Sequence, residues 1–217
     1  MDDGRQLLMY TSVVSEKQPN GEMRDIQTQS VAVGDGLDYV KPACNPVLTQ
    51  KDLPQGFSKF DFRDPKIWRE ADGTYSAVTV ALTEDGSGAA VLFQSKDGFD
   101  WHFVTVLARC NNVYGKMWEC PDFFPLDGKH VLMLGPMEMR PSGEFHNGHN
   151  VIAFVGSYDE KTHTFTREQV QLVDSGIDFY ATQTTQAPDG RRLMTAWLQT
   201  WSDTEDKPQG CKWFGQT

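Results

Sequence analysis

Apolar residues along the chain fall into short β-rich segments, and no long stretch shows the period of an amphipathic helix. Residues 75–82, 90–94, 130–134 and 151–155 are typical segments, and Gly, Pro, Asn and Asp separate them. Short strands divided by turn residues are the pattern of a sheet protein. The sequence therefore predicts an all-β fold.

A loose internal repeat organises these segments. An Asp-Gly pair followed by an apolar run recurs about every 60 residues, at Asp3-Gly4, Asp72-Gly73, Asp127-Gly128 and Asp189-Gly190. Glycine accepts the positive φ of a tight turn, so each pair predicts a β-hairpin. Outer hairpins are predicted at the same interval, around Asp35, Asp97 and Asp159, each closed by an aromatic residue such as Tyr39, Trp101 or Phe165.

Each repeat is long enough for four strands and their turns. Repeated four-stranded sheets with turns at fixed offsets describe a β-propeller. A β-sandwich with chance internal similarity is the alternative on this pattern.

An acidic cluster precedes each complete Asp-Gly hairpin. The clusters are Arg63-Asp64-Pro65, Glu119-Cys120-Pro121-Asp122 and residues 174–178. If the strand before each hairpin is the innermost of its blade, three blades direct carboxylates at one central cavity. Solvated turns explain single acids, but they do not explain acids that recur at the same phase of a repeat.

Converging carboxylates suit glycoside hydrolysis, in which one carboxylic acid protonates the leaving oxygen and another carboxylate attacks the anomeric carbon or activates water. Glu119 is the candidate proton donor, because Trp118, Cys120 and Pro121 give it bulky surroundings of low polarity. The alternative for Glu119 is a surface residue at the start of a strand.

Asp64 is the second candidate. Pro65 is expected to bias Asp64 towards an extended backbone, and the guanidinium of Arg63 is expected to keep its carboxyl group ionised. An ionised Asp64 would accept hydrogen bonds from sugar hydroxyls. A local salt bridge in a turn is the alternative.

Other side chains near the clusters carry weaker signals. Several aromatic rings border the acids and are suited to pack on sugar faces, although core packing is favoured for any single one: Trp118, Phe123, Phe124, Phe179 and Tyr180. His146 and His149 lie in a Gly-rich segment and lack a third ligand at a diagnostic spacing, so a flexible loop is expected there. Metal-binding, nucleotide-binding and nucleophile-elbow motifs are absent, and we expect neither metal nor cofactor.

Net charge and cysteine spacing indicate which binding partners and which cellular compartment to expect. The formal net charge of −10, with acids and bases interleaved, argues against nucleic acid and an anionic membrane as partners. No apolar run is long enough to span a bilayer, and the polar start at residues 1–4 does not read as a signal peptide. Four widely spaced cysteines form no CxxC pair, and a reducing cytoplasm is the expected location: Cys44, Cys110, Cys120 and Cys211.

At its acidic clusters the sequence resembles the family-32 glycoside hydrolases, which include invertases, bacterial sucrose-6-phosphate hydrolases and fructan hydrolases. Arg63-Asp64-Pro65 matches the family's Arg-Asp-Pro motif, and residues 118–126 match its Glu-Cys motif. Residues 174–181 look like the Asp-x-Gly-x-Asp-Phe-Tyr-Ala segment of bacterial members. The resemblance implies a five-bladed β-propeller, here incomplete over residues 1–217: most of blade two, blades three and four, and part of blade five.

The resemblance also implies roles for single residues. Glu119 would be the general acid/base and Asp64 the transition-state stabiliser of a retaining reaction that passes through a covalent fructosyl-enzyme. Arg63 would bind substrate beside Asp64, Cys120 would tune Glu119, and Asp178 and Tyr180 would line the site. The partner would be a small sugar such as sucrose, sucrose 6-phosphate or a fructan.

One departure from the family's pattern affects the expected activity. The family's nucleophile is the Asp of an Asn-Asp-Pro motif in the first blade, and this sequence holds no such motif. We therefore expect the chain alone to hydrolyse little or no sucrose. Two alternatives stay open: a non-catalytic sugar-binding remnant, and another propeller glycosidase that acts on arabinose- or xylose-containing glycans.

Overall fold

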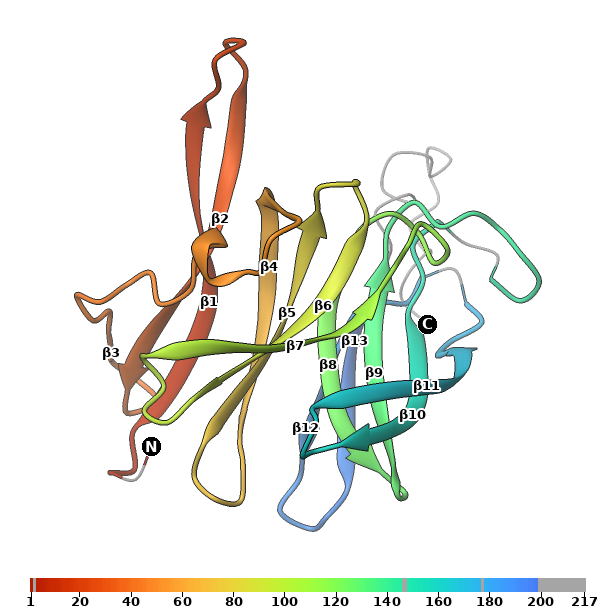
Figure 1. Cartoon of the computed structure of the whole chain (residues 1–217). Helices are drawn as coiled ribbons and strands as arrows, with labels where there is room; N and C mark the ends of the chain where they lie inside the picture. Colours follow the sequence, from red (N-terminus) through yellow and green to blue (C-terminus); the bar gives the residue numbers. More distant parts are fainter. Residues whose placement is uncertain (2, 146–147, 177, 199–217) are drawn as a thin grey trace, which may run out of the picture. The chain divides into compact units, whose positions relative to one another are not determined.

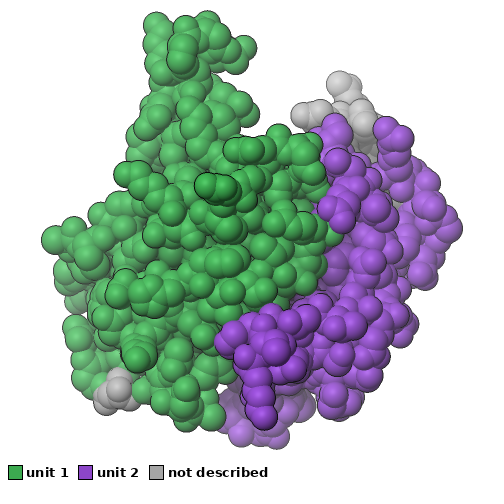
Figure 2. All heavy atoms as spheres, in the orientation of Figure 1, with its two compact units in different colours: residues 1–109 green, residues 110–217 purple. Residues whose placement is uncertain are grey.

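The computed structural model describes residues 1, 3–145, 148–176 and 178–198. The chain divides into two compact units, residues 1–109 and residues 110–217, and each is described by itself (Figure 2). Within the described ranges the regular elements are β-strands and one short 3-10 helix, η1 (Gln50–Asp52), and there is no α-helix. None of these described elements is a helix with the length and apolar character that a bilayer crossing needs.

The first unit contains two antiparallel sheets (Figure 1). One has the order β1-β2-β3, and its β1–β2 hairpin projects beyond the neighbouring sheet of the same unit. The other is a four-stranded meander in the order β4-β5-β6-β7. The strands are β1 (Gln6–Lys17), β2 (Met23–Gly34), β3 (Tyr39–Val40), β4 (Phe57–Arg69), β5 (Tyr75–Thr83), β6 (Gly88–Ser95) and β7 (Trp101–Arg109).

The second unit repeats this plan. A four-stranded meander has the order β11-β10-β9-β8, and a two-stranded sheet pairs β12 with β13. The strands are β8 (Trp118–Leu126), β9 (Lys129–Pro136), β10 (Ile152–Asp159), β11 (Thr164–Leu172), β12 (Tyr180–Gln186) and β13 (Arg192–Trp197). Two complete four-stranded sheets, one in each unit, are the units that the sequence repeat predicts.

Three of the four predicted Asp-Gly turns join consecutive strands, whereas no described strand precedes Asp3-Gly4. Gly73, Gly128 and Gly190 join β4 to β5, β8 to β9 and β12 to β13, with φ values of 90°, 76° and 89°. Only glycine reaches this left-handed region at little cost, so these three hairpin predictions are confirmed.

The outer turns share a different device. Asp35, Asp97 and Asp159 each accept hydrogen bonds from the backbone N–H groups two and three residues further on. These bonds favour the ionised carboxylate and lower the pKa of all three side chains. The repeated aspartates therefore build turns.

Each unit packs its sheets around its own apolar core. In the first unit Leu48, Phe62 and Phe93 are fully buried, and Leu7 and Met9 of β1 pack against the same cluster as β4, β5 and β6. In the second unit Tyr180 of β12 joins a cluster with Met133 and Phe124, so that β12 lies against β8 and β9. Burial of these side chains fixes which faces of neighbouring sheets meet.

The first strand of three sheets carries the same β-bulge. Arg63 and Lys66 of β4 pair with Val80 and Val78 of β5. A separation of three residues in β4 therefore lies opposite a separation of two residues in β5. The same count occurs in β8, where Glu119 and Asp122 oppose Gly135 and Met133, and in β12, where Tyr180 and Gln183 oppose Trp197 and Thr195. An extra residue of this kind bends a strand and redirects its side chains.

The residue inside each bulge has a left-handed backbone. Asp64, Cys120 and Ala181 have φ values of 57°, 48° and 52°, which are uncommon for residues with a Cβ. The prediction that Pro65 holds Asp64 extended is therefore wrong. The bulge between Arg63 and Lys66 imposes the left-handed conformation and overrides the local preference that a following proline creates.

Gly156 provides a test of the packing in the second unit. It lies at the register shift between β10 and β11, and an added Cβ would meet the backbone oxygen of Thr166 at 2.0 Å. Because the backbone oxygen of Thr166 cannot rotate out of the way, Gly156→Ala should lower the free energy of unfolding by about 1–3 kcal/mol or more. Urea unfolding measures this loss. The control variant Ser157→Ala changes the exposed neighbouring residue, and its free energy of unfolding should stay within about 0.5 kcal/mol of that of the parent.

Candidate active site

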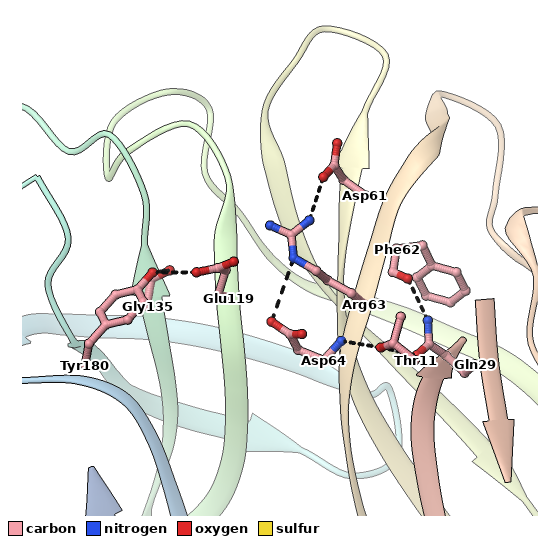
Figure 3. Close-up of polar contacts among 9 residues, drawn as sticks. All are labelled: Thr11, Gln29, Asp61, Phe62, Arg63, Asp64, Glu119, Gly135 and Tyr180. Carbon is pink, nitrogen blue, oxygen red and sulfur yellow. Dashed lines mark hydrogen bonds and ion pairs between the residues drawn. The ribbon is translucent and has the colours of Figure 1, made fainter. Parts of the chain in front are cut away.

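Glu119 lies at the start of β8, one residue before the left-handed Cys120. Its side chain is partly buried, and the hydroxyl of Tyr180 donates a hydrogen bond to Glu119 Oε2 at 2.9 Å (Figure 3). The same hydroxyl lies 3.3 Å from the carbonyl oxygen of Gly135. A phenol has one proton, and the nearer carboxylate oxygen is the stronger acceptor, so Tyr180 fixes one oxygen of Glu119.

Tyr180 is held firmly in this position. Its side chain is 1% exposed, and its ring makes an edge-to-face contact with the ring of His149, with centroids 5.6 Å apart. A Cβ on Gly135 would lie 3.1–3.2 Å from three atoms of the Tyr180 side chain. Gly135 therefore leaves the space that the ring needs to approach β8 and β9.

Asp122 connects the strand of Glu119 to the strand of Tyr180. It is 1% exposed, and its Oδ2 accepts hydrogen bonds from the backbone nitrogen and the hydroxyl of Thr184, at 2.6 and 2.7 Å. Because of the bulge, Glu119 and Asp122 face the same side of the sheet although they are three residues apart. The polar contacts of β8 with β12 therefore include one through the candidate acid and one through a buried carboxylate.

The Arg-Asp-Pro segment lies in the first unit, on β4. Arg63 Nη1 pairs with Asp61 Oδ1 at 2.6 Å, and Arg63 Nε lies 3.9 Å from Asp64 Oδ2 (Figure 3). The Arg63 side chain is 12% exposed, whereas that of Asp64 is 28% exposed. A guanidinium held by two carboxylates has a fixed direction, and the Asp64 carboxylate beside it is partly exposed.

The structure places the other predicted site residues as follows. Cys120 is a partly buried free thiol beside Glu119, and Asp178 is partly buried two residues before Tyr180. Glu119 and Tyr180 are thus brought together within the second unit, and Arg63 and Asp64 within the first. The meeting of Asp64, Glu119 and Asp178 in one pocket involves both units and stays a prediction.

The structure also bears on the predictions made for the aromatic residues, the cysteines and a metal site. Trp118, Phe123, Phe124 and Tyr180 are buried, which confirms core packing as their main role. Cys44, Cys110 and Cys120 are free thiols, while Cys211 and His146 lie outside the described residues. Among the described side chains, no group of three or more His, Cys, Asp or Glu is arranged to hold a metal ion.

Sequence reasoning missed the supporting residues. It assigned no role to Asp61, and it treated Asp122 only as part of a motif. It also overlooked Thr11 and Gln29, which contact β4 on either side of Arg63. The spacing of Glu119 and Asp122 suggests opposite faces of a regular strand, so the bulge had to be seen before their shared direction was evident.

The two four-stranded meanders, with the bulge repeated in β4, β8 and β12, are typical of the blades of a β-propeller. All of residues 1–217 match the model of the glycosyl hydrolases family 32 N-terminal domain. The chain belongs to this family.

Relatives and solved structures agree with the family match. The chain is 37% identical over 202 residues to the sucrose-6-phosphate hydrolase of Bacillus subtilis (strain 168), with 90% of this chain and 40% of the relative covered. It is 35% identical to the raffinose invertase of Escherichia coli, with 92% and 41% covered. A Bombyx mori GH32 β-fructofuranosidase, solved as a mutant in complex with sucrose, superposes with a TM-score of 0.81 at 33% identity, covering 91% of this chain and 41% of that structure.

These matches confirm the predicted fold class, an all-β chain that holds blades of a β-propeller. The chain spans about two fifths of the length of the curated relatives that it matches.

The Asp122–Thr184 contact yields a prediction about the support of the site. Asp122→Ala removes the oxygen that accepts both bonds from Thr184, so we expect it to lower the free energy of unfolding by about 1.5–3 kcal/mol. Urea unfolding measures the loss. Thr184→Ser keeps both donors and should cost less than half as much; equal losses in the two variants would contradict the role given to Asp122.

Proposed function

We propose that this chain is the part of a retaining β-fructofuranosidase that carries the general acid/base Glu119 and the transition-state stabiliser Asp64. The substrate class is sucrose, sucrose 6-phosphate or a related fructoside. The observation that carries the proposal is the hydrogen bond of 2.9 Å from buried Tyr180 to Glu119, within a chain whose whole length matches family 32.

The proposed reaction has two steps. Glu119 protonates the glycosidic oxygen as a carboxylate attacks the anomeric carbon, and the leaving sugar departs. Glu119 then removes a proton from the water that breaks the fructosyl-enzyme bond. Tyr180 supports these roles by holding one oxygen of Glu119 and so fixing the direction of its carboxyl group.

Asp64 has a different part in the proposal. It accepts hydrogen bonds from fructosyl hydroxyls, and these strengthen as the ring flattens and gains positive charge in the transition state. Arg63, fixed by Asp61, is proposed to bind sugar oxygens beside it. Cys120 is proposed to tune Glu119, and Asp178 to line the site with Tyr180.

The attacking carboxylate is absent from the proposed set. The family's nucleophile belongs to an Asn-Asp-Pro motif, and the 217 residues contain none. The chain by itself is thus proposed to bind a fructosyl unit and to turn over little or none. A cytoplasmic location belongs to the same proposal, because the four cysteines are widely spaced and form no CxxC pair.

The isolated chain should bind fructose in calorimetry but release no reducing sugar from sucrose. Asp64→Asn should weaken the binding, because an amide replaces a carboxylate that accepts hydroxyl protons. Ser157→Ala, an exposed change in β10, is the control. Robust sucrose turnover that Glu119→Gln abolishes would contradict the missing nucleophile, and absence of fructose binding would contradict the retained sugar site.

A chimera tests the role of Glu119 directly. This chain replaces the matching segment of the Bacillus subtilis sucrose-6-phosphate hydrolase, whose remaining segments supply the rest of the enzyme. Hydrolysis of sucrose 6-phosphate and sucrose is then measured. Glu119→Gln should lower kcat by about 100-fold to 10,000-fold, the usual contribution of a general acid. A chimera that keeps its rate after this change would refute the assignment.

A further inference from the structure

The bulge in β4 is held from a neighbouring sheet of the same unit. Two residues, Asp64 and Pro65, lie between Arg63 and Lys66, the residues that pair with β5. An extra residue in a ladder leaves backbone polar groups that need partners outside it, because an unpaired buried N–H or C=O is costly. The backbone groups flanking Arg63 are the carbonyl of Phe62 and the N–H of Asp64.

Thr11 and Gln29 bond both of these groups. The Asp64 N–H donates to Thr11 Oγ1 at 3.1 Å, and Gln29 Nε2 donates to the carbonyl oxygen of Phe62 at 2.7 Å (Figure 3). Thr11 Oγ1 in turn donates to Gln29 Oε1 at 3.0 Å. These hydrogen bonds therefore link the carbonyl of Phe62 to the N–H of Asp64 through the side chains of Gln29 and Thr11.

The two side chains are themselves fixed. Thr11 and Gln29 lie directly opposite each other in the β1–β2 register. Gln29 is fully buried, and its backbone N–H and carbonyl also bond across to Leu48 and Val47. The direction of the Gln29 amide follows from chemistry, since a carbonyl such as that of Phe62 only accepts and must face the NH₂ group.

The chemistry of these two residue types explains why both are needed. A threonine hydroxyl accepts one bond and donates another at the same atom, and a glutamine amide accepts and donates at opposite ends. Valine has the shape of threonine but makes neither bond. Within the first unit, Asp61 orients the guanidinium of Arg63, while Thr11 and Gln29 hold the backbone that bears it.

We propose that Thr11 and Gln29 are positioning residues that hold Asp64 in its left-handed conformation, and so set the direction of its carboxylate towards a fructosyl unit. The role of Asp64 in this proposal rests on the proposed function, whereas the conformational part does not. Neither Thr11 nor Gln29 belongs to the motifs that relate this chain to its family, and both come from the strands before β4.

Hydrogen exchange of backbone amides, followed by NMR on the full chain, tests the conformational part. In the parent chain the Asp64 N–H should be protected, although it lies inside a bulge. Thr11→Val should speed its exchange about tenfold or more, the effect of losing one buried hydrogen bond. Thr11→Ser keeps the hydroxyl and should leave the rate within about twofold.

Ser12→Ala is the matched control in the same hairpin. It removes a hydroxyl that donates to Ser30 at 2.8 Å, away from β4. Equal effects of Ser12→Ala and Thr11→Val on the Asp64 amide would overturn the proposal. If Thr11→Val does not fold, the parent rate alone decides, because an unprotected Asp64 N–H is incompatible with the bond to Thr11.

Calorimetry with fructose separates this proposal from the proposed function. Thr11→Val should weaken fructose binding at least about threefold, while its thermal midpoint stays close to that of Ser12→Ala. Unchanged fructose affinity with faster exchange would overturn the positioning role. A parent chain that binds no fructose would refute the sugar site, and the exchange rates would still decide whether the pair holds Asp64.

Discussion

The site depends on one backbone constraint, the β-bulge that recurs in β4, β8 and β12. In each strand the bulge places a residue with positive φ directly after Arg63, Glu119 or Tyr180. A regular strand would alternate these side chains strictly between two faces, and a bulge breaks the alternation at a chosen point. The acid and the buried Asp122 therefore face the same neighbour strand, and the guanidinium of Arg63 lies between Asp61 and Asp64. The bulge that recurs in these three strands therefore also positions candidate site residues in each of them.

Polar contacts between neighbouring sheets keep the bulges in place. In the second unit Asp122 accepts hydrogen bonds from Thr184 and Tyr180 donates one to Glu119, and these bonds help to hold β8 against β12. In the first unit Thr11 and Gln29 bond both sides of Arg63. Each contact also pairs polar groups that are wholly or partly buried, so stability and site geometry come from the same bonds.

The fold was predictable because its signals are local and repeated. Asp-Gly turns and short apolar runs report tight hairpins wherever they occur, and Gly73, Gly128 and Gly190 have the left-handed backbone that such turns need. The candidate residues Glu119 and Asp64 were predictable from their motifs and phase. The conformation of Asp64 was not, because a following proline signals an extended residue and only pairing with β5 reveals the bulge. Thr11, Gln29 and Thr184 were equally hidden, since their partners lie far along the sequence and nothing in their own neighbourhood marks them.

We propose that Asp64 and Glu119 bind the same furanose ring, which stays a prediction of the sequence. A crystal structure of the chain with bound fructose tests it most directly. We expect the sugar hydroxyls to lie within hydrogen-bond distance of the Asp64 carboxylate, with Glu119 facing the anomeric oxygen of the same molecule. A structure in which the two carboxylates face separate regions of solvent, with no sugar between them, would contradict it.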